Sequence, residues 1–124
     1  MKRAAMAIAV AGMLGMGGGS VRSAETADVT LIGEVVDLHC YVTRGAAGPD
    51  HAGCANACIG RGVTPGFLAD DGRVFVLLGG RPFSVKDQIA GLAGEKVTLT
   101  GTPVERGGMR ALQLKTVERR AAAH

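Results

Sequence analysis

Short runs of β-branched and other apolar residues, separated by glycine-containing turns, recur along most of this chain. Fifteen of its 20 glycines fall in residues 25–124. Glycine at this density is typical of turns and bulges and disfavours a helical bundle. The length of 124 residues is enough for one domain and not for two. The pattern therefore predicts one small, mainly β domain.

Five segments have the composition of strands. They are Val29–Leu38, Pro65–Ala69, Val74–Leu78, Glu95–Arg106 and Met109–Val117. The Asp-Gly pair in residues 70–73 predicts a hairpin turn between the second and third segments, and the glycine pair at 107–108 predicts another between the last two. Ser84 is placed to cap a helix over Val85–Leu92, with Gly94 just beyond its end.

This order of elements, with one helix between the third and fourth strands, is that of an OB-fold. Gly33 and Gly101 lie inside long strands, where glycine permits the bends that close a small barrel. We therefore predict a five-stranded OB-like barrel with a helix between strands 3 and 4. A helical loop that carries cysteine and histidine joins strands 1 and 2. An open α+β sheet or another small barrel is the alternative.

The first 24 residues have the pattern of a secretory signal peptide. A basic start, Met1–Arg3, is followed by the uncharged apolar run Ala4–Met16 and then by glycine and serine. That run of 13 residues is shorter than the span of about 20 needed to cross a bilayer. Cleavage after Ser23 fits the pattern better than cleavage after Ala24. We expect residues 25–124 to form a single exported domain, periplasmic or secreted, with no membrane span after cleavage.

The signal-like segment also accounts for the net charge of +3, because residues 25–124 hold 11 basic and 11 acidic side chains. A neutral domain disfavours binding to nucleic acid. Phe67 and Phe75 fall on the strands that bind single strands in OB-folds, but we expect both in the core. A basic cluster near the C-terminus is interpreted as a solvated strand edge; it comprises Arg106, Arg110, Lys115, Arg119 and Arg120.

The three cysteines and two of the three histidines are concentrated between the first two strands. A short helix over Ala52–Ile59 would place His51, Cys54 and Cys58 within roughly 60° of one another. Cys40, at the end of the first strand, reaches them if the loop folds back. Three sulfurs and one imidazole suit tetrahedral Zn²⁺ or soft Cu(I). The sequence predicts a transition-metal site, for zinc or copper, made of these four residues.

Two other hypotheses use the same cysteines. Exported proteins usually oxidise their thiols, and a bond from Cys40 to Cys54 or Cys58 would stabilise the fold by roughly 3 kcal/mol. A Cys54–Cys58 bond is disfavoured, because side chains four residues apart on a helix are too far apart. Under this hypothesis the protein is a disulfide-stapled interaction or ligand-binding module. The hypothesis leaves one cysteine without a role, and this odd cysteine favours the metal-binding hypothesis. A thiol redox protein that uses the odd cysteine is the third hypothesis.

The remaining polar residues indicate a binding protein rather than an enzyme. His39 is a weak candidate ligand, because neighbours on a strand face opposite ways. Asp37 is able to orient a ligand, although we expect a solvated position at the strand end. No phosphate loop, paired catalytic carboxylates or Ser-His-Asp grouping is present in the sequence. We expect a periplasmic protein as the partner; the sequence identifies neither that partner nor the oligomeric state.

Several short motifs together resemble a group of small exported bacterial proteins, OB-fold-like and uncharacterised in function. The motifs are GEVVD at 33–37, CY at 40–41, HxxCAxxC at 51–58, GVTPG at 62–66 and the Asp-Gly hairpin. The resemblance implies that Cys40, His51, Cys54 and Cys58 act as a unit. It implies no particular activity.

Overall fold

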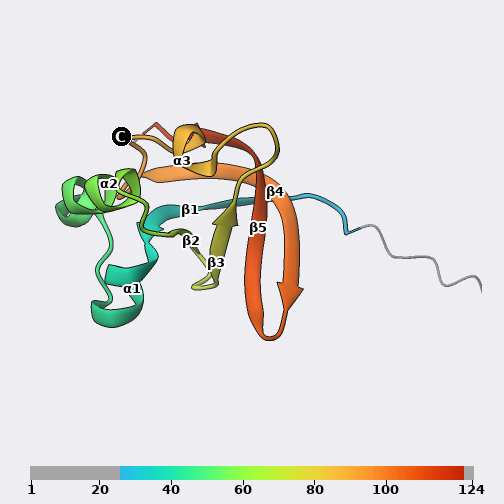
Figure 1. Cartoon of the computed structure of the whole chain (residues 1–124), viewed down its shortest axis with the longest axis horizontal. Helices are drawn as coiled ribbons and strands as arrows, with labels where there is room; N and C mark the ends of the chain where they lie inside the picture. The colour runs from blue at the N-terminus through green and yellow to red at the C-terminus, as the bar shows by residue number, and fades with distance from the viewer. Residues whose placement is uncertain (1–25, 122–124) are drawn as a thin grey trace, which may run out of the picture.

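A computed structural model describes residues 26–121, in which five strands form one closed ring (Figure 1). The strands are β1 (Val29–Asp37), β2 (Pro65–Ala69), β3 (Val74–Leu78), β4 (Lys96–Arg106) and β5 (Met109–Arg119). Their order around the ring is β1-β2-β3-β5-β4, and β4 pairs again with β1. The β3–β5 pairing is parallel and the other four are antiparallel. The predicted mainly β fold and its five strands are confirmed, with small differences at the strand ends.

Of the four helical segments within residues 26–121, three lie in the connection between β1 and β2. They are α1 (Leu38–Arg44), the 3₁₀ turn η1 (Pro49–His51) and α2 (Ala52–Gly60). Figure 1 shows α1 and α2 on the left of the view, beside the end of β1. The fourth segment, α3 (Val85–Gln88), links β3 to β4.

The interior of the ring is filled by apolar side chains from every strand. Phe67, Leu99 and Leu112 are fully buried, and Phe75 is nearly so. The same buried cluster includes Ile89, which follows α3, and Ala55 and Ile59 of α2. Burying a side chain of this size stabilises the fold by about 1.5–3 kcal/mol. The prediction that Phe67 and Phe75 belong to the core is confirmed.

Gly33 and Gly101 lie inside long strands. At Gly33 the strand β1 changes its pairing partner, and at Gly101 the strand β4 changes its register. Gly33 pairs with Ala69 of β2 on one side and with Val97 of β4 on the other. A Cβ atom at Gly33 would overlap the carbonyl oxygen of Leu68. Gly101 lies where the β4–β5 register shifts by one residue, and its missing Cβ leaves room for the backbone of β5.

Two local predictions differ more clearly from the structure: one missed a helix and the other extended a helix too far. The strand predicted over Val29–Leu38 ends at Asp37, and the chain turns there into α1, which the sequence reading missed. The helix predicted over Val85–Leu92 ends at Gln88. A tight turn follows it, and Gly91 takes a left-handed backbone conformation (φ +74°) that stops the helix early.

The basic side chains near the C-terminus are all exposed, as expected for a solvated edge. Three of them form ion pairs: Arg110 with Glu105, Lys115 with Asp28, and Arg119 with Glu95. The predicted signal peptide, residues 1–24, lies outside the described residues. Within residues 26–121, no helix is both long and apolar enough to cross a membrane.

Replacing Gly33 by alanine should destabilise the fold by about 2–3 kcal/mol, because the new Cβ atom has no space against the β2 backbone. Urea unfolding followed by circular dichroism measures the change. Gly60→Ala is the matched control. Nothing lies within 4 Å of a Cβ atom there, so its free energy of unfolding should stay the same or rise by up to about 1 kcal/mol. Equal stability of the two variants would contradict the closed ring.

Candidate metal centre

Cys40 is held in place by the start of α1. The carboxylate of Asp37 caps this helix by accepting a hydrogen bond from the backbone N–H of Cys40, at 3.1 Å. At the other end, Gly45 takes a left-handed conformation (φ +66°) and donates to the last free carbonyls. The short helix turns the Cys40 side chain inward, where it is 4% exposed.

His51 and Cys54 approach Cys40 from the second helical unit of the loop. Pro49 begins η1, and His51 ends it and occupies the N-cap position of α2, so His51 precedes the helix on which the sequence placed it. Cys54 lies in the first turn of α2. One donor atom from each of Cys40, His51 and Cys54 lies within 4.8 Å of the other two. Three of the four predicted ligands are therefore brought together.

Cys58 lies one helical turn beyond Cys54 and is not part of the group whose donor atoms lie within 4.8 Å of one another. Partial burial raises the pKa of Cys58, and the neighbouring side chains of Asp37 and Cys54 raise it further. Cys58 is thus adjacent to the group without belonging to it.

The imidazole of His51 meets a chemical requirement for a ligand. Its Nε2 atom is buried and has no hydrogen-bond partner in the described part of the chain. Buried side-chain nitrogens in proteins are nearly always hydrogen-bonded or bound to a metal. An unpartnered imidazole nitrogen on a residue next to two cysteine sulfurs fits a metal that accepts nitrogen and sulfur.

Arg44 completes the surroundings of Cys40. Its Nη2 atom donates to the Cys40 sulfur at 2.8 Å, and this contact raises the pKa of Arg44. A fixed positive charge beside the sulfur offsets the negative charge that accumulates when several thiolates share one ion. The sequence reading missed Arg44, because it lies four residues after Cys40 on a helix that was not predicted.

Asp37 is fully buried, so the expectation of a solvated carboxylate at this position is wrong. Burial disfavours its charged form, but the hydrogen bond from the Cys40 backbone N–H to Oδ1 and the neighbouring thiols of Cys40 and Cys58 outweigh that cost and lower the pKa of Asp37. The other carboxylate oxygen, Oδ2, is buried and has no hydrogen-bond partner in the described part of the chain. The carboxylate of Asp37 therefore positions Cys40 through the backbone N–H of that residue.

Two other polar residues of the loop stay outside the cluster. His39 is exposed on α1 and is not part of the donor group, in line with its weak prediction. Asn56 instead anchors α2 to the chain before β4: its Nδ2 atom donates to the carbonyl of Ala93 at 3.2 Å, and its Oδ1 atom accepts from the backbone N–H of Ala93 at 3.1 Å.

All three cysteines are free thiols in this structure. The sulfurs of Cys40 and Cys54 are neighbours but are not bonded, so the structure gives no support to a disulfide staple. Comparison with known proteins adds no assignment: no protein-family model matches the chain, and no match was found among curated proteins or among solved structures. The chemistry of the site is therefore argued from its geometry.

Replacing Asp37 by alanine should lower the free energy of unfolding of the reduced, metal-free protein by about 1–2 kcal/mol, since α1 loses its cap. Asp37→Asn, which keeps a capping oxygen, should lose less. Ser84→Ala is the control: Ser84 occupies the N-cap position of α3 but makes no capping hydrogen bond, so its effect should stay within about 0.5 kcal/mol. Similar losses for Asp37→Ala and Ser84→Ala in urea unfolding would refute the capping role.

Proposed function

We propose that this chain is an exported metal-binding protein that holds one Zn²⁺ or Cu(I) ion between α1 and α2. The observation that carries the proposal is the group of donor atoms from Cys40, His51 and Cys54, all within 4.8 Å of one another. The unpartnered Nε2 atom of His51 supports it, because a buried nitrogen without a partner is costly unless a ligand occupies it.

The spacing of the donors suits a soft or borderline transition metal. Zinc binds sulfur at about 2.3 Å and imidazole nitrogen at about 2.0–2.1 Å, so donors around one ion lie about 3.5–4 Å apart. The observed group needs only a small contraction to reach this range. Magnesium and calcium are disfavoured, because they prefer oxygen ligands.

Zinc and copper place different demands on Cys58. Structural zinc is bound by four ligands, whereas Cu(I) selects soft sulfur ligands. We infer that Cys58 is the fourth ligand when Zn²⁺ is bound, giving a set of three cysteines and one histidine. Its interaction with Cys54 supports this role, since the two thiols are already neighbours. Cu(I) would be held by Cys40, His51 and Cys54.

The OB type of the ring and the export of the chain belong to the same proposal. The strand order around the ring and the short helix in the β3–β4 connection support an OB-like barrel. The signal-like pattern of residues 1–24 supports a periplasmic or secreted location. In such an oxidising compartment, a bound metal would protect three thiols that otherwise tend to form disulfides.

The unequal exposure of the ligands supports delivery of the ion to a partner rather than a purely structural role. Cys40 is buried and His51 is half-buried, but Cys54 is exposed. A partner in the periplasm could therefore reach the ion from the side of Cys54.

Metal content measured on anaerobically purified protein tests the proposal. After loading with Zn²⁺ or Cu(I) and removal of excess, the protein should retain about one equivalent. Cys40→Ser and His51→Ala should retain less than about one fifth of that. His39→Ala is the matched control, because His39 is an exposed histidine outside the group. Retention below about one tenth of an equivalent by the unaltered protein would overturn the metal assignment.

Cys58→Ser distinguishes the two ligand sets. It should weaken Zn²⁺ binding by at least about tenfold, because one of four ligands is lost. Cu(I) binding should change by less than about twofold, since the three remaining donors are untouched. Competition titrations against a chromophoric chelator measure both affinities. Unchanged Zn²⁺ affinity would remove Cys58 from the ligand set and leave the other three in place.

A further inference from the structure

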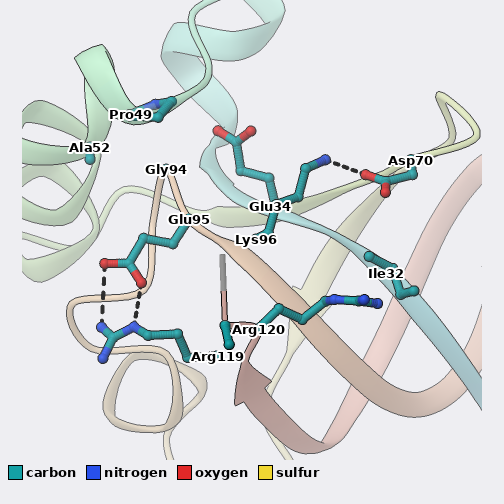
Figure 2. A pocket seen from close by; sticks show the side chains of 11 residues that line it. Ile32, Glu34, Pro49, Ala52, Asp70, Gly94, Glu95, Lys96, Arg119 and Arg120 are labelled. Carbon is teal, nitrogen blue, oxygen red and sulfur yellow. Dashed lines mark hydrogen bonds and ion pairs between the residues drawn. The ribbon is translucent and has the colours of Figure 1, made fainter. Parts of the chain in front are cut away.

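An open groove of about 1150 Å³ lies on the face of the molecule where β1, the start of β4 and the end of β5 meet the beginning of α2 (Figure 2). None of the cluster residues Cys40, His51 and Cys54 lines it. It is therefore a separate feature, with no role yet in the proposed function.

The surface of the groove is mostly apolar. Ile32 of β1 is 40% exposed and forms one wall, and Pro49 and Ala52 form the opposite wall. Gly94 packs closely against the second wall: a Cβ atom there would overlap the side chain of Ala52. A cleft with apolar walls and few free polar groups is the usual form of a small-molecule site.

Most charged groups at the rim already have partners. Lys96 pairs with Asp70, and Arg119 pairs with Glu95, as the dashed lines in Figure 2 show. Glu34 accepts a hydrogen bond from the backbone N–H of Gly48. The two ion pairs neutralise their own charges and contribute little to attracting a ligand, whereas the Glu34 carboxylate forms no ion pair with any residue between 26 and 121.

Arg120 is the exception. Its backbone N–H donates to the carbonyl of Lys96 at 2.9 Å, which fixes the residue at the groove. Its guanidinium forms no ion pair with any residue between 26 and 121. In Figure 2 the side chain extends along the groove toward Ile32. An unpaired cation thus lies beside an apolar wall.

We propose that this groove binds a small amphipathic anion, with an apolar chain or ring and a single carboxylate. The apolar part packs against Ile32, Pro49 and Ala52, and the carboxylate pairs with the guanidinium of Arg120. The flat, forked guanidinium accepts a carboxylate through two hydrogen bonds. The neutralised rim disfavours ligands that carry several charges.

Octanoate and 1-octanol are suitable probes, because they share a chain length and differ in charge. Amide chemical shifts of the full chain, followed by NMR during titration, locate the binding. Octanoate should shift the amides of Ile32, Gly94 and Lys96 in a saturable way. The affinity for 1-octanol should be about fivefold lower, since it lacks the charge that pairs with Arg120.

Arg120→Gln should reduce octanoate affinity about fivefold and leave 1-octanol affinity unchanged. Arg110→Gln is the matched control: Arg110 is an exposed arginine of β5 that lies outside the groove, so both affinities should stay the same. Ile32→Ser should weaken both probes. The proposal is overturned if the shifts fall elsewhere, if octanoate and 1-octanol bind Arg120→Gln and the unaltered chain alike, or if no saturable shift occurs. Metal content is an independent readout, so either proposal can fail without the other.

Discussion

The buried carboxylate of Asp37 links the ring of strands to the loop that carries the sulfur ligands. Asp37 is the last residue of β1 and pairs with Pro65 of β2. Its side chain caps α1 through Cys40 and interacts with the thiol of Cys58. An isolated buried carboxylate would be costly. The hydrogen bond from the Cys40 backbone N–H offsets part of this cost and also fixes the position of Cys40, so the stability of the strand end and the geometry of the cluster depend on the same group.

The long β1–β2 connection would be expensive to order if its ends were free, because closing a loop costs conformational entropy. The ring removes much of this cost. The backbone N–H of Leu38 bonds to the carbonyl of Thr64 at 3.1 Å, which fixes the two ends of the loop next to each other. Inside the loop, Glu34 accepts from Gly48, and Asn56 bonds to the backbone of Ala93. These contacts attach η1 and α2 to the ring, and they hold His51 and Cys54 near Cys40 without a bound ion.

The cluster and the groove share a segment of chain although they share no lining residue. Pro49 and Ala52 form a wall of the groove, and His51 lies between them in sequence and contributes to the cluster. The same short turn, held by Gly48 and Glu34, therefore orients residues toward both sites. Apolar side chains fill the small interior of the ring and leave little space there for a ligand. Both surfaces are therefore built on the loop outside the ring.

Local patterns in the sequence determined the strands, both hairpin turns, α2 and the choice of the cysteines and His51 as candidate metal ligands. Each of these depends on neighbours close in the chain: β-branched runs, glycine pairs in turns, and helical spacing between Cys54 and Cys58. Only the tertiary structure decided which of these ligands meet. In the structure, β1 ends at Asp37 and α1 begins at the next residue. The carboxylate of Asp37, which the sequence predicted to be solvated, is buried. The cap was hard to recognise, because the preceding residues favour a strand and no glutamate or glutamine follows at the third helical position, which is Cys40. The role of Arg44 depends on α1, a helix that the local sequence pattern did not predict. The role of Arg120 depends on contacts between elements that are distant in sequence. No local rule could therefore reveal either role.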